Sequence, residues 1–501
     1  MVVTCGEMKE IEEAAFARGI QASELMNQAG LGIAEVIQQF HPKPGVLGLY
    51  LGKGNNAGDA LVAAKHLFHR GWRVWARLGF AIGDLKELPR KHWFELAELV
   101  PEIERLNPLP SSGLPLVLLD GLVGIGAEGA LKGSLSALAT EMNAQRKQSH
   151  ARVFAMDIPS GLNGDSGEID GVCVEADVTV TIDHVKRGLL ADGAVNQVGR
   201  IAVVPLSALA ANATPSPIEA LTASGLRNHL TRRPFHFHKG MAGRVGLIAG
   251  SVGFTGAAAL AALGALRGGA GLVKLFVKKD AYPMIASQAA PEAMVTVIED
   301  YREVLEDPLD SLAMGPGLGF EYEEEIMDLL ARAKVPMVID ADALTMLARS
   351  KSNPLAVSQA PRLLTPHPGE MARLAAGHRQ FAGLDRRTLA ESYSALHPDC
   401  ALLLKGARTV IAQTGKPTCF NTTGTPGMAS GGMGDVLTGV CAALIAQGID
   451  VHSAACIGAW TSGRAAELAL STGHCSEESL LATDLATHLG AAFNALKMGS
   501  Y

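Results

Sequence analysis

A glycine-rich loop that ends in a carboxylate is the segment of this chain with the clearest chemistry. Residues 421–435 read Asn-Thr-Thr-Gly-Thr-Pro-Gly-Met-Ala-Ser-Gly-Gly-Met-Gly-Asp, and an apolar helical pattern follows up to Gly448. The N–H groups at a helix N-terminus attract anions such as phosphate, and glycine lets the backbone approach closely. Asp435 would repel a phosphate, but it could take a proton from a hydroxyl beside one. We interpret the loop as a phosphoryl-transfer site, in preference to an Asp that only caps the helix.

Three other segments place polar side chains where apolar strands are expected to end. The turn Lys405-Gly-Ala-Arg-Thr409 joins an apolar strand at residues 402–404 to a second one at 410–412. Its lysine, backbone amides and hydroxyl could hold nucleotide phosphates. Residues 338–344 and 364–370 have the same arrangement of an apolar run followed by polar groups. Ligands bind at this edge of open α/β sheets, so we expect one site here.

The first half of the chain alternates between predicted strands and helices. Residues 46–51 read as an apolar strand, and the glycine-rich turn 52–59 follows. A helical stretch to His69 and a strand at 74–78 complete a βαβ unit. The turn therefore lies where a dinucleotide or another phosphate ligand could bind.

Three later strands of this half each end in an aspartate: Asp120, Asp157 and Asp183. If these strands are parallel neighbours, their aspartates converge at the ligand edge of the sheet. Asp120 and Asp157 are candidate functional residues, because the glycine-rich segment 121–129 follows the first and Ile-Pro-Ser-Gly at 158–161 follows the second. Asp183 has no such context, and we interpret it as a side chain that caps the following turn or helix.

The composition is typical of large α/β domains. The 501 residues are enough for two or three domains, and 48% hydrophobic residues with 56 glycines fit sheets that are buried on both faces. The formal net charge of −7, without a long basic run, makes nucleic acid an unfavoured partner. Seven scattered cysteines without a Cys-x-x-Cys pair predict a reduced, cytoplasmic protein. We also expect a homo-oligomer.

No membrane segment is expected. Residues 245–266 carry no charge and are long enough to span a bilayer, but their glycines read as strand, loop and helix. Residues 1–13 contain four glutamates and no apolar stretch, so no signal peptide is expected.

Small and polar residues at 206–217 predict a linker between a domain at 1–213 and another at 217–501. Two histidines, His236 and His238, stand among basic residues near the start of the second domain. Anion contact or surface packing is favoured over metal binding for them, because no acidic residue or cysteine is close in sequence.

Eight ordered motifs between residues 216 and 501 resemble the ADP/ATP-dependent NAD(P)H-hydrate dehydratase family, which has a ribokinase-like α/β fold. The motifs are Lys239-Gly-x-x-Gly-Arg244, Gly250-Ser-x-Gly-x-Thr-Gly-Ala-Ala258, Pro291-Glu-Ala-Met294, Gly315-Pro-Gly-Leu-Gly319, Asp340-Ala-Asp-Ala-Leu344, Thr365-Pro-His-Pro-Gly-Glu370, Lys405-Gly-x-x-Thr409 and Gly431-Gly-x-Gly-Asp435. Each is weak alone, but the eight in this order are specific.

Residues 1–206 resemble the NAD(P)H-hydrate epimerase domain, a Rossmann-like αβα sandwich. The resemblance rests on the loop at 55–60, the strand end at Asp120 and the Asp157-Ile-Pro-Ser-Gly161 segment. Ala57 and Ala60 stand where the family usually has glycine, and Ala57 would be strained if the loop required a positive φ.

The resemblance implies a repair enzyme that combines an isomerase and a lyase. Hydration damages NADH and NADPH and gives R and S hydrates. The first domain would interconvert these epimers, with Asp157 handling the proton. The second would phosphorylate the S form from ADP or ATP, with Asp435 as the base, and the loss of phosphate would restore the reduced nucleotide.

The resemblance also implies which residues would bind each ligand. A potassium ion would be held by Asn56, Asp120 and Ser160. The epimerase substrate would contact Asn55, Asn56, Ala57, Gly58, Asp59, Gly124, Ile125, Gly126, Ala127, Glu128, Gly129, Ala130 and Asp157. The hydrate in the second domain would contact Ala257, Gly317, His367 and Asp435. ADP or ATP, with magnesium, would contact Lys405, Gly406, Ala407, Arg408, Thr409 and Gly434.

Two alternatives stay open from the sequence. A ribokinase-like domain that phosphorylates another small alcohol would give a stable phosphorylated product. The first domain could also be a non-catalytic Rossmann-like binding module, for which Ala57 and Ala60 are the supporting features. Catalysis is favoured because this chain retains the side chains Asn56, Asp120 and Asp157 of the epimerase motifs.

Overall fold

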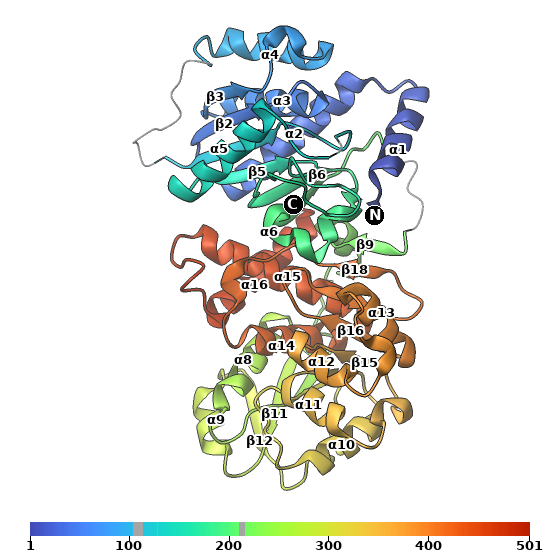
Figure 1. The fold of residues 1–501 in the computed structure, drawn as a ribbon. Helices are drawn as coiled ribbons and strands as arrows, with labels where there is room; N and C mark the ends of the chain where they lie inside the picture. Colours follow the sequence, from blue (N-terminus) through green and yellow to red (C-terminus); the bar gives the residue numbers. More distant parts are fainter. Residues whose placement is uncertain (104–113, 128, 210–215) are drawn as a thin grey trace. The chain divides into compact units, whose positions relative to one another are not determined.

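The computed structural model describes residues 1–103, 114–127, 129–209 and 216–501, and these form two compact units (Figure 1). The first unit comprises Met1–Ser216 together with the last residue, Tyr501, and the second comprises Pro217–Ser500. Ala213, the expected end of the first domain, and Glu128 lie outside the described residues.

The first unit contains a six-stranded parallel sheet. In sheet order its strands are β3 (Arg73–Leu78), β2 (Val46–Leu51), β4 (Leu116–Gly121), β5 (Arg152–Met156), β6 (Val178–Ile182) and β8 (Arg200–Val204). The helices are α1 (Cys5–Ala17), α2 (Ala22–Phe40), α3 (Asn55–His69), α4 (Glu87–Leu99), α5 (Ser134–Gln148) and the short α6 (Val195–Val198). A separate parallel pair joins β1 (Val2–Val3) to β7 (Val185–Lys186).

Alternation along the strands builds a core on each face of this sheet. Leu47 and Leu49 of β2 pack into the core under α2 and α3, whereas Tyr50 points into the opposite core with Met142 of α5. Buried side chains on both faces explain why the strands read as continuous apolar runs. The αβα sandwich expected from the sequence is confirmed.

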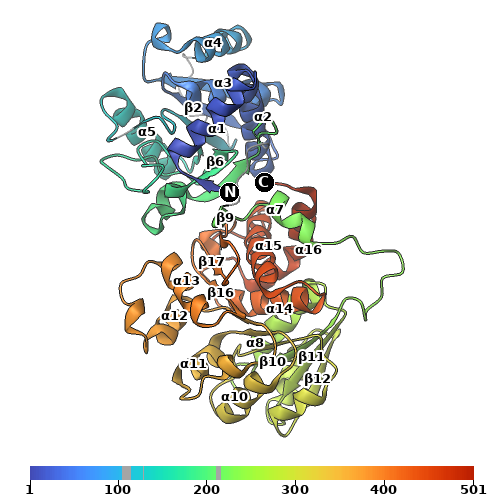
Figure 2. The same cartoon turned by 90° about the vertical axis from the view of Figure 1, so that its right-hand side faces the viewer.

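The second unit contains a ten-stranded mixed sheet (Figure 2). In sheet order its strands are β12 (Ala293–Val297), β11 (Leu272–Val277), β10 (Arg244–Ile248), β13 (Ser311–Met314), β14 (Met337–Ile339), β15 (Arg362–Leu364), β16 (Cys400–Leu404), β17 (Val410–Ala412), β18 (Thr418–Phe420) and β9 (Ile218–Ala220). The strands from β12 to β16 are parallel, β17 is antiparallel to both neighbours, and β18 is parallel to β9. The carboxyl ends of the parallel strands therefore share one edge.

The helices of the second unit are α7 (Ala223–Leu226), α8 (Thr255–Arg267), α9 (Tyr282–Gln288), α10 (Glu323–Arg332), α11 (Ala341–Arg349), α12 (Pro368–Ala375), α13 (Arg386–Leu396), α14 (Met433–Ala446), α15 (Val451–Ser471) and α16 (Ala482–Met498). Helix α14 is buried almost all round in the main core, between α8 and α15. Its Gly439 lets α8 approach closely, because a Cβ there would lie 2.0 Å from the Ala261 carbonyl. This close packing fixes the position of the N-terminus of α14.

The apolar residues 245–266 form β10, a loop and most of α8, as the sequence predicts. Within the residues that the structure describes, no helix combines the length and the apolar character that a membrane crossing needs.

Candidate active sites

Asp435 lies in the first turn of the buried helix α14. The helix begins after Gly432, whose φ of +88° and close neighbour Leu260, 2.5 Å from a built Cβ, suit only glycine. Among the described residues, no side chain caps this helix end. Its first N–H groups are therefore available to an anion, and Asp435 stands beside them.

An ion pair from two other strand ends lies next to this turn. Lys405, directly after β16, donates through Nζ to Oδ1 of Asp340, directly after β14, at 2.8 Å. Asp340 is 1% exposed, and its Oδ2 accepts a hydrogen bond of 2.8 Å from Thr438 of α14. A Cβ on Gly434 would lie only 3.3 Å from Lys405 Nζ. The ammonium group therefore faces the glycine-rich start of α14.

Burial and the neighbouring carboxylates change the protonation of this cluster. Burial, and next the charge of Asp340, raise the pKa of Asp435 to about 6, against the lowering effect of Lys405. Burial alone would lower the pKa of Lys405, but Asp340 raises it above its ordinary value. A carboxyl that titrates near neutrality and a lysine that stays charged suit a general base beside a phosphate.

The residues expected to contact the hydrate lie in two groups, Gly317 with Ala257, and His367 with the neighbours of Lys405. Gly317 has a φ of +58°, and a Cβ there would lie 2.9 Å from the side chain of Ala257 at the start of α8. His367 is about half exposed and precedes α12, where its Nδ1 accepts from the backbone N–H of Gly369 at 2.9 Å. Its Nε2 lies 3.4 Å from Glu370, whose carboxylate is 3.9 Å from Lys405 Nζ. His367 is thus connected to the Lys405–Asp340 pair.

The residues expected to bind the nucleotide form the turn between β16 and β17. Gly406 and Ala407 are exposed, whereas Arg408 is buried. The Thr409 hydroxyl donates to the Gly406 carbonyl at 3.2 Å, and the Thr409 carbonyl accepts from the N–H of Asn421 at 2.9 Å. The turn is therefore tied to the start of the loop that leads to Asp435. The side chain of Lys405, its first residue, pairs with Asp340.

In the first unit, Asn56, Asp120 and Ser160 converge around the backbone of Val123. Asn56 donates to the Val123 carbonyl at 3.0 Å, and the Ser160 hydroxyl accepts from the Val123 N–H at 3.0 Å. Ser160 also donates to Asp120, through its hydroxyl at 2.7 Å and its N–H at 2.8 Å. The three residues come from α3, β4 and the segment after β5, whose ends meet because β4 and β5 are parallel neighbours.

The donor set suits a hard cation. Asp120 is fully buried, and burial raises its pKa to about 6 in spite of the hydrogen bonds from Ser160. Among the described residues, no lysine, arginine or histidine pairs with this carboxylate. A cation surrounded by carboxylate, hydroxyl and carbonyl oxygens would balance its charge. The residues present therefore fit a potassium ion.

Asp157 lies directly after β5 in a left-handed conformation with a φ of 63°. Its Oδ1 pairs with Lys186 Nζ and accepts from the Thr181 hydroxyl at 3.2 Å. Lys186 belongs to β7 and is 1% exposed. The ion pair fixes the position of the Asp157 side chain at the end of the sheet.

Further carboxylates face Asp157. Burial, and then the charges of Asp157 and Glu12, raise the pKa of Asp59 well above its ordinary value. The sequence had not identified Glu12 or Lys186 as site residues, because neither belongs to one of the motifs. Asp340 and Glu370 appeared only as parts of motifs, without a role. The charge interactions in the folded structure show that all four residues lie beside expected site residues.

The expected glycine-rich loop at 52–59 is shorter than the sequence suggested. Helix α3 begins at Asn55, so residues 55–59 form its first turns, and only residues 52–54 are loop. Ala57 and Ala60 are buried within this helix, and neither has a positive φ. The strain considered for Ala57 is therefore absent. Gly124 packs against Asn56, whereas Gly126, Ala127 and Gly129 are exposed, and Ile125 and Ala130 are half-buried.

Two other sequence interpretations concern residues outside these sites. Asp183 accepts from the N–H of Leu206 at 3.0 Å, in keeping with the structural role expected of it. His236 and His238 are exposed, and His238 accepts from the Gly240 N–H at 3.2 Å. Within the described residues, neither histidine belongs to a group that could hold a metal ion.

Comparison with known proteins gives two family matches. Residues 245–489 match the family described as NAD(P)H-hydrate dehydratase, and residues 22–188 match the YjeF-related protein N-terminus. The bifunctional NAD(P)H-hydrate repair enzyme of Moorella thermoacetica is 36% identical over 93% of this chain and 92% of its own length. The enzyme of the same name from Coxiella burnetii is 34% identical over 97% of this chain and 98% of its own length.

A solved structure is also similar to part of the chain. It is the ADP/ATP-dependent NAD(P)H-hydrate dehydratase from Bacillus subtilis, co-crystallised with ATP and Mg²⁺. It is 31% identical, covers 55% of this chain and 97% of its own, and has a TM-score of 0.47.

Proposed function

We propose how this chain, which belongs to the family of bifunctional NAD(P)H-hydrate repair enzymes, divides that repair between its two units. The first unit interconverts the R and S hydrates of NADH and NADPH. The second dehydrates the S hydrate at the expense of ADP or ATP and restores the reduced nucleotide. Hydroxide is a poor leaving group and phosphate a much better one, which explains why a nucleotide is consumed.

The observation that carries this proposal is the position of Asp435 beside the Lys405–Asp340 pair at the N-terminus of α14. Asp435 takes the proton from the hydroxyl of the hydrate as the phosphoryl group is transferred. The free N–H groups of the first turn of α14 stabilise the charge on that group. The turn 405–409 holds the nucleotide, and Ala257, Gly317 and His367 contact the hydrate.

A magnesium ion is expected to travel with the nucleotide and to neutralise part of the phosphate charge. The buried carboxylate of Asp340, which keeps Lys405 charged, and the half-buried Asp342 supply oxygens on the same side of the site. Asp342 Oδ2 accepts from the Gly319 N–H at 2.9 Å, which ties it to the loop around Gly317.

In the first unit, Asp157 moves the proton in epimerisation, and its ion pair with Lys186 orients its carboxylate. Asn56, Asp120 and Ser160 would hold potassium, which would supply positive charge to this site. The substrate lies against the first turns of α3, residues 55–59, and against the segment 124–130. Ala57 and Ala60 fit a regular helix, which supports the catalytic interpretation of this unit over the non-catalytic one.

A direct experiment tests the proposal and separates it from the kinase alternative. The full chain is incubated with purified S hydrate of NADH and with ADP or ATP, while NADH absorbance and free inorganic phosphate are followed together. We expect one phosphate released for each NADH restored. Consumption of the nucleotide with a stable phosphorylated product and no NADH would establish a kinase instead.

The seven cysteines are all free, which supports the cytoplasm as the compartment of this enzyme.

A further inference from the structure

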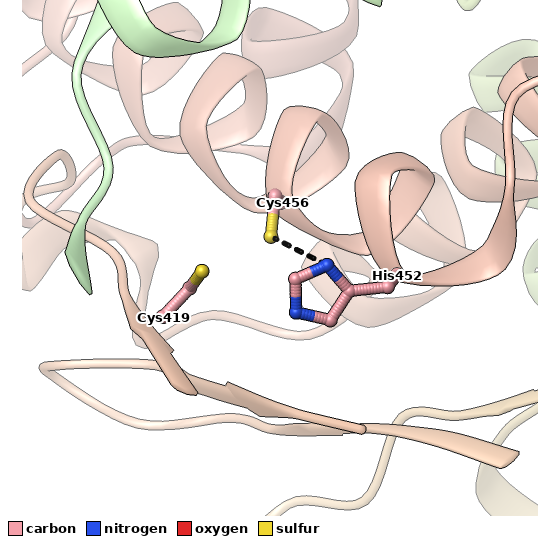
Figure 3. Close-up of side chains that lie close together, drawn as sticks. All are labelled: Cys419, His452 and Cys456. Carbon is pink, nitrogen blue, oxygen red and sulfur yellow. Dashed lines mark hydrogen bonds between the residues drawn. The ribbon is translucent and has the colours of Figure 1, made fainter. Parts of the chain in front are cut away.

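Three side chains with metal-ligating atoms meet inside the second unit, away from the residues assigned above (Figure 3). Cys419 comes from β18, and His452 and Cys456 come from the first turns of α15. Their ligand atoms, one from each residue, all lie within 4.8 Å of one another. The exposed fractions are 3%, 7% and 3%, so all three are buried.

The local structure explains why these side chains meet. His452 and Cys456 are four residues apart and therefore lie on one face of α15. Asp450 caps this helix by accepting from the Ser453 N–H at 3.2 Å, which fixes where the helix begins. Cys419 is the central residue of its strand and belongs to the same core as Cys456. In Figure 3 its sulfur points toward the space between the other two side chains.

The tautomer of His452 is set by a backbone group. Its Nε2 lies 3.1 Å from the Pro417 carbonyl oxygen, which can only accept, so Nε2 carries the proton. Nδ1 therefore has a free lone pair, and it faces Cys456 Sγ at 3.9 Å. A ring N–H that donates to a carbonyl while the other nitrogen is left unprotonated is the usual arrangement of a metal-binding histidine.

The ordinary explanation is that buried cysteines pack as small hydrophobic side chains. This explanation does not account for the position of the His452 imidazole beside the two cysteines. The contact of the imidazole Nδ1 with the Cys456 thiol is long, at 3.9 Å, and a thiol is a weak donor. A cation would satisfy both sulfurs and the nitrogen at once.

We propose that Cys419, His452 and Cys456 bind one thiophilic metal ion of the zinc(II) type, and that this ion fastens the β17–β18 hairpin to α15. Zinc bond lengths of about 2.3 Å to sulfur and about 2.0 Å to nitrogen require about 3.6 Å between tetrahedral ligands, close to the 3.9 Å observed. Glu219 pairs with Cys419 across the β18–β9 ladder and has an exposed side chain. The fourth position is open to this carboxylate or to water.

The ion has a structural role at a distance from the phosphoryl-transfer residues. Asn421, two residues after Cys419, donates its N–H to the Thr409 carbonyl at 2.9 Å. Fixing β18 on α15 therefore also fixes one end of the turn 405–409. The site does not depend on the substrate assigned to that turn, and its test needs no activity measurement.

The test is zinc binding by the full chain after reduction and removal of metal with a chelator. Zinc is then titrated in competition with a chromogenic chelator. We expect one zinc per chain, and about a hundredfold or more weaker binding in Cys419→Ser, Cys456→Ser and His452→Gln. Cys400→Ser, which changes a buried cysteine of β16 outside the cluster, and Cys475→Ser should bind as the wild type does. Cobalt(II) should give thiolate-to-metal charge-transfer absorption in the wild type and these two controls alone.

Circular dichroism of the metal-free variants shows whether each is folded, so that weaker binding is not mistaken for unfolding. Zinc should raise the unfolding temperature of the wild type and of Cys400→Ser, but not of Cys456→Ser. The proposal is overturned if the folded wild type takes up no zinc, or if Cys419→Ser binds it equally well. It is also overturned if mass spectrometry finds a Cys419–Cys456 disulfide and the reduced protein takes up no zinc.

Discussion

Lys405 and Asp340 form a 2.8 Å ion pair that joins the carboxyl ends of two strands, β16 and β14, next to the first turn of α14. The two residues are 65 positions apart in the chain. Their pairing keeps one positive charge beside a glycine-rich helix N-terminus and one negative charge beside Asp435. Lys405, which we propose binds phosphate, and Asp435, which we propose accepts the proton, therefore lie in the same site but have separate roles.

Replacing Asp435 with Asn should abolish nucleotide-dependent dehydration without loss of the fold. The change removes the base but keeps the size of the side chain, and losing a general base costs about a hundredfold or more in rate. The folded protein holds the pKa of this acid above its ordinary value, so its ionised form lowers stability as pH rises through about 6. The Asn variant should therefore be at least as stable as the wild type at pH 7.

The measurements are initial rates of NADH recovery from the S hydrate and thermal unfolding. Asp399→Asn, which changes an exposed carboxylate of the same unit, is the matched control and should keep full activity. A rate within a fewfold of the wild type would remove Asp435 from the mechanism.

The pH dependence of dehydration should follow the ionisation of Asp435. The base works when it is deprotonated, so kcat/KM for the S hydrate should fall as pH decreases through about 6 and level off above it. Lys405 lowers the pKa of Asp435, so Lys405→Met should move the inflection to higher pH and also weaken nucleotide binding. The profiles are measured at fixed ionic strength. An inflection that stays in place in Lys405→Met would show that these two charges do not interact.

Potassium should affect only the first of the two activities. Exchanging potassium for tetramethylammonium at constant ionic strength should slow epimerisation of the R hydrate but leave dehydration of the S hydrate unchanged. Asp120→Asn keeps the shape of the side chain but removes its charge, and should raise the potassium concentration for half-maximal epimerisation at least about tenfold. Asp170→Asn, an exposed change in the same unit, should respond as the wild type does. Equal potassium dependence in both variants would place the ion elsewhere.

Restoring glycine at position 57 should not improve the enzyme. Ala57 is fully buried in α3 and has a helical backbone. The additional backbone conformations that glycine allows are therefore not needed at this position. Ala57→Gly should lower the free energy of unfolding of the first unit by roughly 0.5–1 kcal/mol, with an unchanged or lower rate of epimerisation. Urea unfolding and the rate of R hydrate conversion measure the two effects. A severalfold faster epimerase would mean that Ala57 does restrict the site.

The strand ends of both sites were predictable from the sequence because each follows an apolar run. Asp120 and Asp157 follow apolar runs, whereas Asp435 ends the glycine-rich loop in front of an apolar helix, and the order of residue types was enough to single out all three. The partners of these carboxylates could not be predicted in this way. Lys186 reaches Asp157 because β6, which ends four residues before it, is the parallel neighbour of β5, and Asp340 reaches Lys405 through the order of strands in the sheet. Strand order and pairing are long-range properties that local patterns do not encode.

The same limit applies to the cysteine cluster. Cys419 is 33 residues before His452, and their segments meet only because β18 packs on α15. Counting cysteines and searching for Cys-x-x-Cys spacing predicted a reduced compartment but gave no indication of this group. Conversely, the strain considered at Ala57 depended on a backbone conformation, which one residue name cannot reveal.

Conversion of a mixture of R and S hydrates is the most direct test of two activities in one chain. The full protein is given the equilibrated mixture of NADH hydrates with ADP or ATP and potassium, and NADH absorbance is followed to completion. We expect both epimers to be converted faster than they interconvert spontaneously, and Asp157→Ala to convert the S hydrate alone. If the wild type leaves the R hydrate to its spontaneous epimerisation, the first unit is a binding module and this account of its function is wrong.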